Sequence, residues 1–276
     1  SLQQIATTQA VTGVAISPNG ESIAYTLSVP RVPGKGKDGP NFSQLHVLDA
    51  AGQSRPFVSG EVNIASPTWL DNGNIAFLMK GDKDETRSLY RIPADGGGAT
   101  LWKSLKTNIN RFDVSPDGKQ LALIGIEEEN AEAKALRDRG FDARVVEEGE
   151  RRLRLWLSSS EDNAAPKVLD IEGSVQSAQW SPAGDRLALI VAPNERVDDT
   201  LVLAKVTIVS TDGRVISVID NPGKLGQLAW STDGEHLAII SAEDASDPRE
   251  GRLTVVSKNG GKQRDLLPGL LGHIWN

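Results

Sequence analysis

A short turn motif recurs five times along the chain and constrains its fold more than any other feature. Each copy has an apolar residue, often tryptophan, four residues before a glycine, and the copies occupy residues 16–20, 69–73, 114–118, 180–184 and 230–234. A sixth copy begins at 273–276. A motif that returns every 45 to 65 residues or so is typical of a repeat architecture, in which each repeat is one structural unit.

The residues around each motif predict four short antiparallel strands. In the fourth copy we expect strands at 177–180, 186–191, 204–209 and 215–219. Pro182 and Gly184 favour the first turn, and Asp212-Gly213 is typical of a tight hairpin. The other copies repeat this order, with second strands expected at 22–28, 74–79, 120–126 and 236–241. Four antiparallel strands per repeat predict the blade of a β-propeller.

The predicted fold is therefore an all-β propeller with five complete blades and the start of a sixth. We place the blades at about 12–59, 64–103, 108–170, 174–220 and 225–267, with the sixth opening near Leu271. A ring that ended inside a blade would expose unpaired strand edges. We therefore expect the propeller to continue beyond Asn276.

The first residue of each motif is predicted to lie in the core between neighbouring blades, because its spacing follows the repeat. Loss of one such tryptophan side chain should cost about 3–5 kcal/mol. The residues at this position are Ile16, Trp69, Val114, Trp180, Trp230 and Trp275.

Two segments interrupt the repeat. Residues 127–152 contain nine acidic and six basic side chains, and we expect a short solvated helix at 127–139 that ends at Gly140. This insertion is either a charged surface excursion or a protrusion that covers or lines a site. Residues 30–40 are glycine-rich and indicate a flexible linker, because they lack the pattern of a phosphate-binding loop.

Composition excludes several classes of function. The chain has 30 Lys and Arg against 37 Asp and Glu, and its formal charge of −7 argues against a nucleic-acid partner. It has no cysteine and no apolar run long enough to span a membrane. It begins at Ser1, and its only methionine is Met79, so either a leader was removed or the sequence belongs to a longer protein.

A search for catalytic groups predicts no catalytic residue, no metal site and no cofactor. The histidines are His46, His236 and His273, and no two of them have the spacing of metal ligands. The nucleophile motif Gly-x-Ser-x-Gly is absent from the sequence.

Four glutamates are the candidate substrate-binding residues. Glu61 and Glu172 each precede the first strand of a blade, and Glu147 and Glu148 lie in the long insertion. Together they could form an anionic mouth that holds the ammonium group of a substrate by charge-assisted hydrogen bonds. Ordinary solvated surface acids are the alternative interpretation.

Several segments resemble the propeller of bacterial prolyl oligopeptidase-family serine peptidases, in the acylaminoacyl-peptidase and dipeptidyl-peptidase branch. The resemblance covers essentially the whole chain. The segments that carry it are TGVAISPNG at 12–20, AYTLSVPR at 24–31, RPFVSGEVN at 55–63, SLYRIPADGG at 88–97 and the insertion that leads into LRLW at 153–156.

This resemblance implies a substrate-gating and substrate-binding propeller that is not catalytic by itself. Its implied partners are a peptide substrate and a C-terminal α/β-hydrolase domain of the same polypeptide, which carries the catalytic triad. It also implies that acidic residues grip a peptide's free amino terminus, and that the protein is periplasmic or secreted. The alternative is a stand-alone Tol-type periplasmic propeller that serves as a protein-binding scaffold.

Overall fold

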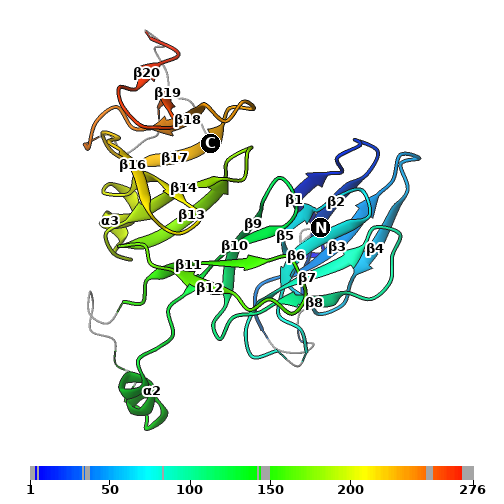
Figure 1. Ribbon diagram of the computed structural model, residues 1–276. Helices are drawn as coiled ribbons and strands as arrows, with labels where there is room; N and C mark the ends of the chain where they lie inside the picture. Colours follow the sequence, from blue (N-terminus) through cyan, green and yellow to red (C-terminus); the bar gives the residue numbers. More distant parts are fainter. Residues whose placement is uncertain are drawn as a thin grey trace. The chain divides into compact units, whose positions relative to one another are not determined.

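The protein forms five four-stranded antiparallel sheets (Figure 1). The computed structural model describes residues 4, 6–32, 34, 38–82, 84–141, 143, 150–246 and 251–268. The chain divides into two compact units, residues 1–110 and 111–276. Each unit is described here by itself.

In every sheet the strands pair in the order in which they occur along the chain. The two sheets of the first unit are β1 (Ala10–Ile16), β2 (Ile23–Val29), β3 (Phe42–Leu48) and β4 (Ser54–Val58), and β5 (Ala65–Trp69), β6 (Asn74–Met79), β7 (Ser88–Pro93) and β8 (Thr100–Lys103). These are blades one and two of the predicted propeller.

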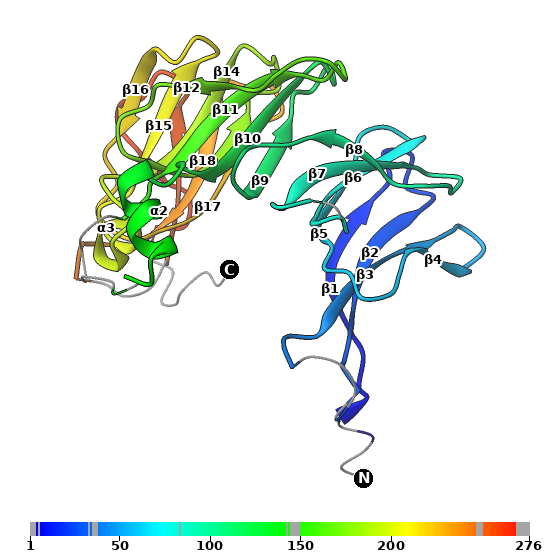
Figure 2. The ribbon, with the colours of Figure 1, turned by 90° about the horizontal axis from the view of Figure 1, so that it is seen from below.

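The second unit holds the other three sheets, although the first of its strands starts just before the boundary. They are β9 (Ile109–Val114), β10 (Gln120–Ile126), β11 (Leu153–Ser159) and β12 (Lys167–Leu169); β13 (Ser174–Trp180), β14 (Arg186–Ala192), β15 (Lys205–Ser210) and β16 (Val215–Ile219); and β17 (Leu225–Trp230), β18 (His236–Ser241), β19 (Arg252–Ser257) and β20 (Arg264–Asp265). Figure 2 shows these sheets stacked face to face. All five predicted blades are confirmed to within about two residues at each end, while the expected sixth lies outside the described residues.

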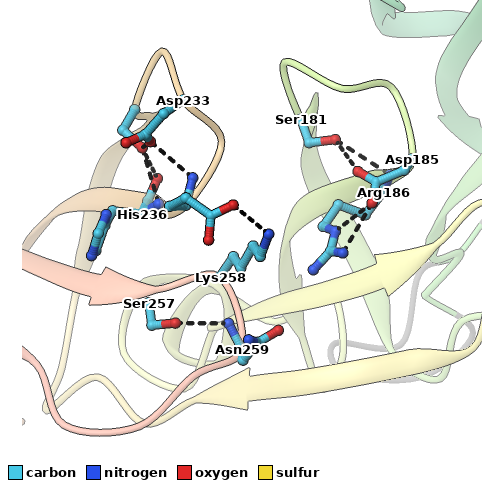
Figure 3. Close-up of polar contacts among 10 residues, drawn as sticks. Ser181, Asp185, Arg186, Asp233, His236, Ser257, Lys258 and Asn259 are labelled. Carbon is cyan, nitrogen blue, oxygen red and sulfur yellow. Dashed lines mark hydrogen bonds and ion pairs between the residues drawn. The ribbon is translucent and has the colours of Figure 1, made fainter.

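The recurrent motif forms the turn between the first and second strands, and in blades one, three, four and five its serine closes that turn. In blade four the Ser181 Oγ donates to Asp185 Oδ1 at 2.8 Å and accepts the backbone N–H of Arg186 at 3.3 Å (Figure 3). Gly184 has φ 69°, a left-handed conformation that glycine adopts without a steric penalty.

Blade five closes its turn with the same chemistry. The Ser231 Oγ donates to Asp233 Oδ1 at 2.5 Å and accepts the backbone N–H of His236 at 2.9 Å. An ion pair of 2.6 Å between Lys258 Nζ and Glu235 Oε1 then joins this turn to the hairpin that follows β19 (Figure 3). The motif is thus conserved from blade to blade because it satisfies the polar groups of a tight turn.

The tryptophans of the motif join neighbouring blades by packing against clusters of buried residues that include an alanine of the preceding blade. Trp69 packs against the cluster that contains Ala24, and its Nε1 donates to the carbonyl of Ala15 at 3.0 Å. Trp230 packs against the cluster that contains Ala188, and its Nε1 donates to the carbonyl of Gln179 at 3.3 Å. Alanine on the second strand of one blade leaves room for the indole of the next.

Trp180 occupies the same kind of interface but lacks the indole hydrogen bond. It is 4% exposed, in a cluster with Ala122 and Leu187. Among the described residues its Nε1 has no partner. Three of the four predicted core tryptophans are therefore confirmed between blades, and Trp275 lies outside the described residues.

The prediction that the motif's first residue is always buried is wrong at Ile16, which is 65% exposed. Val14, on the same strand, is 61% exposed. In the first unit, blade two packs on the opposite face of blade one, the face that carries Ala24. Within that unit, no described sheet covers the face that Ile16 shares with Val14. Val114 is half-buried.

The long insertion contains a short solvated helix, as predicted. Helix α2 (Ala131–Asp138) begins where the Asn130 side chain accepts the Glu132 N–H at 2.8 Å, and none of its residues is buried. It ends at Gly140, which has φ 90° and donates to the carbonyl of Arg137 at 2.8 Å. A second short helix in blade four, α3 (Val197–Leu201), was not predicted. Of the glycine-rich segment 30–40, residues 33 and 35–37 lie outside the described residues.

Candidate functional site

Glu61 and Glu172 lie at the blade end that carries two kinds of connection. In an antiparallel meander, the links from second to third strands and the links from one blade to the next leave at the same end. Glu61 follows β4 and Glu172 follows β12, so both precede a first strand as predicted. Both are exposed, and neither makes a hydrogen bond or an ion pair within the described part of the chain.

The structure does not test whether the four glutamates form one site. Glu61 belongs to the first unit and Glu172 to the second. Glu147 and Glu148 lie outside the described residues. The anionic mouth therefore stays a prediction.

At this end of the second unit, the structure instead positions Glu195, which the sequence search did not select. Glu195 follows β14 and is half-buried. Its Oε1 accepts the hydroxyl of Ser174 and the Nε2 of Gln176, the latter at 2.5 Å. Ser174 is fully buried and accepts the backbone N–H of Leu153 at 2.9 Å. Neutral donors thus hold the Glu195 carboxylate in place.

A second carboxylate at the same end is already neutralised. Glu127, at the start of the insertion, accepts the Arg154 Nε at 2.7 Å and the backbone N–H of Arg152 at 3.2 Å. Arg152 also donates to the side chain of Asn194 at 3.1 Å. Because its charge is paired, Glu127 anchors the base of the insertion and is less suited than Glu195 to hold a cationic ligand.

Asp113, on β9, is a half-buried carboxyl at the junction of blades three and four. Its Oδ2 accepts the backbone N–H of Trp180 at 2.9 Å, and its Oδ1 accepts that of Val114 at 3.0 Å. Burial raises the pKa of Asp113, and the two backbone hydrogen bonds act in the opposite direction. The sequence carried a signal for this residue, since Ala15, Thr68, Gln179 and Ala229 hold the equivalent position. Nothing in the local sequence distinguishes Glu195.

The acidic loop after β6 has a structural role. Asp84 accepts the hydroxyl of Tyr90 at 2.5 Å and the backbone N–H of Gly81 at 3.1 Å. Burial, together with this hydrogen bond, raises the pKa of Tyr90 to about 12. The loop is therefore tied to β7.

His46 lies in a strand, stacked on Tyr25 with 5.4 Å between ring centroids. Burial lowers its pKa, so its neutral form is favoured. His236 is exposed beside a turn, and His273 lies outside the described residues. In the part of the chain that the structure describes, no three His, Asp or Glu side chains gather as metal ligands, and no helix is long and apolar enough to cross a membrane.

Comparison with known proteins gives two curated relatives, both named as peptidases. The chain is 28% identical over 123 residues to dipeptidyl-peptidase 5 of Porphyromonas endodontalis, a match that covers 43% of this chain and 17% of that protein. It is 26% identical over 149 residues to the uncharacterized peptidase YuxL of Bacillus subtilis, covering 51% of this chain and 20% of that protein. The chain thus matches about a fifth of the length of each relative. No family model matches it.

Several solved structures share the fold at low sequence identity. The acylaminoacyl peptidase of Pyrococcus horikoshii superposes with a TM-score of 0.66 at 15% identity, covering 96% of this chain and 40% of that one. The β-propeller domain of the Trilobed protease from Pyrococcus furiosus gives 0.62 at 15% identity, with 96% and 73% covered. TolB from Acinetobacter baumannii gives 0.54 at 15% identity, with 97% and 71% covered. The chain therefore has the β-propeller fold that is found in peptidase propeller domains and in TolB.

Proposed function

We propose that this chain is the substrate-gating and substrate-binding propeller domain of a serine peptidase that acts on short peptides. The observation that carries the proposal is the pattern of coverage. Nearly the whole chain, 96%, superposes on only 40% of an acylaminoacyl peptidase, and both curated relatives are named as peptidases. A propeller of this extent supplies one part of such an enzyme.

In this proposal the chain is non-catalytic by itself. A C-terminal α/β-hydrolase domain of the same polypeptide carries the nucleophile and its base. The propeller limits which substrates reach that domain. Export to the periplasm or the medium belongs to the same proposal.

Substrate binding is assigned to the acidic side chains at one end of the blades. Glu61, Glu147, Glu148 and Glu172 would hold the free amino terminus of a peptide by charge-assisted hydrogen bonds. Support comes from the positions of Glu61 and Glu172, which both precede a first strand and are both exposed. Glu195 joins this set, because its carboxylate is held by neutral donors and keeps its charge available.

The length of peptide that the native protein cleaves tests the gating role. Purified native protein would be assayed with one cleavable sequence placed in a short peptide and, unchanged, in an exposed loop of a folded protein. We expect cleavage of the peptide alone, because the folded carrier is excluded. Equal cleavage of both would contradict gating, and cleavage of neither would contradict the peptidase assignment.

The match to TolB favours one alternative, a stand-alone periplasmic propeller that binds a protein partner. The superposition covers 71% of that TolB chain, a larger share than in the acylaminoacyl peptidase. Affinity capture of the native protein distinguishes the two functions. A stoichiometric protein partner, without peptide cleavage, would favour the scaffold.

A further inference from the structure

The first strands of blades three, four and five enclose a hollow that none of the roles above uses. It has a volume of about 350 Å³ and lies entirely within the second unit. This volume falls at the lower end of the range of about 300–1,000 Å³ for small-molecule sites. Its polar lining comes from Arg111 and Asp113 on β9, Ser177 and Gln179 on β13, and Gln227 on β17.

Two opposite charges stand side by side in this hollow without neutralising each other. Arg111 and Asp113 are two residues apart on β9, so their side chains leave the same face of the strand. Arg111 is exposed, and no described carboxylate pairs with it. Asp113 accepts only backbone N–H groups, from Trp180 and Val114. The hollow therefore offers both a cation and an anion.

The spacing of the two strand positions that carry these charges is comparable to the length of a short peptide. Two residues along a strand span about 6.6–6.8 Å. An extended dipeptide spans at most about 7 Å between its ends. A dipeptide with both ends free therefore has about the length that separates the two strand positions from which the Arg111 and Asp113 side chains leave.

The rest of the lining suits the body of a small peptide. Phe112, Ala178, Ile190 and Leu228 supply an apolar surface, which favours apolar ligand side chains. The register of β17 slips between Leu225 and Leu228, so its intervening residues leave the ladder. Such a bulge leaves backbone groups available for hydrogen bonds to a ligand amide.

We propose that this hollow binds a dipeptide with two free ends, whose ammonium group contacts Asp113 and whose carboxylate contacts Arg111. The inference rests on the proposed function, because a dipeptide is then a product or a small fragment of the peptides that the enzyme cleaves. The site would retain or sense such fragments within the propeller, away from the reacting bond.

Calorimetric titration of the 276-residue chain with the dipeptide Ala-Leu tests the proposal. We expect one site, with affinity at least tenfold lower for N-acetyl-Ala-Leu and for Ala-Leu amide. The variants Asp113→Asn and Arg111→Gln should each bind Ala-Leu at least tenfold more weakly than the wild type. The controls Asp170→Asn and Arg214→Gln, at exposed positions, should bind it like the wild type. Circular dichroism would show that each variant is folded.

Absence of binding, or equal binding of the free and blocked dipeptides by the wild type, would overturn the proposal. A lower affinity for only one of the two blocked dipeptides would also overturn the proposal, because the site would then recognise a single charge. The blocked ligands keep the test decisive even if a variant fails to fold. Failure here would leave peptide cleavage by the native protein unaffected, so it is distinguishable from failure of the proposed function.

Discussion

Asp113 illustrates how one half-buried side chain makes the stability of a blade junction depend on pH. Its pKa lies near 3.8 in an unfolded chain, and burial raises it in the folded protein. The folded state therefore binds the proton more tightly, and its free energy of unfolding falls as the pH rises from 3.8 through the folded pKa.

The variant Asp113→Asn has no carboxyl to ionise, so it should not lose stability as the pH rises. Its melting temperature at pH 7 should therefore be higher than that of the wild type. The difference from the wild type should shrink towards pH 3, where the wild-type carboxyl is protonated in both states. Thermal unfolding followed by circular dichroism from pH 3 to pH 7 measures this. Asp170→Asn, at an exposed carboxyl, is the matched control. A variant that is less stable than the wild type by the same amount at pH 7 and at pH 3 would contradict the explanation.

Tyr90 ties the acidic loop to its strand through a single hydroxyl. Tyr90→Phe keeps the ring and removes the 2.5 Å hydrogen bond to Asp84, which retains the N–H of Gly81. We expect a loss of about 1–2 kcal/mol in the free energy of unfolding in urea, because a buried charged acceptor loses one donor. Tyr25→Phe, which removes the 2.6 Å contact with Ser54 near the surface, should cost less. Equal losses of unfolding free energy in the two variants would show that burial of the Tyr90 hydroxyl does not strengthen its contribution to stability.

At the scale of the element, most strand positions could be predicted from alternation and turn residues. Gly20, Gly118, Gly184 and Gly234 all adopt the positive φ that the motif requires, so each turn fixes the register of the two strands it joins. Helix α3 could not be predicted, because five residues carry too little periodicity to distinguish a helical turn from a loop.

The fit between indole and alanine at each blade interface gives a prediction for packing. Trp230→Ala should cost about 3–5 kcal/mol through the cavity it leaves. Ala188→Leu, on the facing blade, should cost about 1–3 kcal/mol by overfilling the same space. Equilibrium unfolding in urea measures both.

Ala183→Leu, in the exposed turn of the same blade, is the control for the added volume and should change stability by less than about 0.5 kcal/mol. A neutral Ala188→Leu would mean that the indole does not fill the space beside that alanine.

At the scale of the whole molecule, the repeat predicted the number of complete blades but not the site. Ile16 holds the right place in the motif yet is 65% exposed, because burial there depends on a neighbouring sheet and not on the residue itself. Glu195 and Asp113 acquire their environments from strands far along the chain, since Ser174 lies 21 residues from Glu195 and Trp180 lies 67 from Asp113. Such long-range partners leave no local pattern that identifies Glu195, whereas Asp113 could be noticed only as a carboxylate where the other repeats have neutral residues.

We propose that this propeller serves a serine peptidase whose bond-breaking residues lie in another domain of the same polypeptide. Labelling of the native protein with a fluorophosphonate, followed by intact mass measurement of the species captured by an antibody to this chain, tests it most directly. The account predicts a labelled polypeptide well above the 29.5 kDa of this chain, with the label on a serine outside these 276 residues. An unlabelled native protein, or a label within these residues, would contradict it.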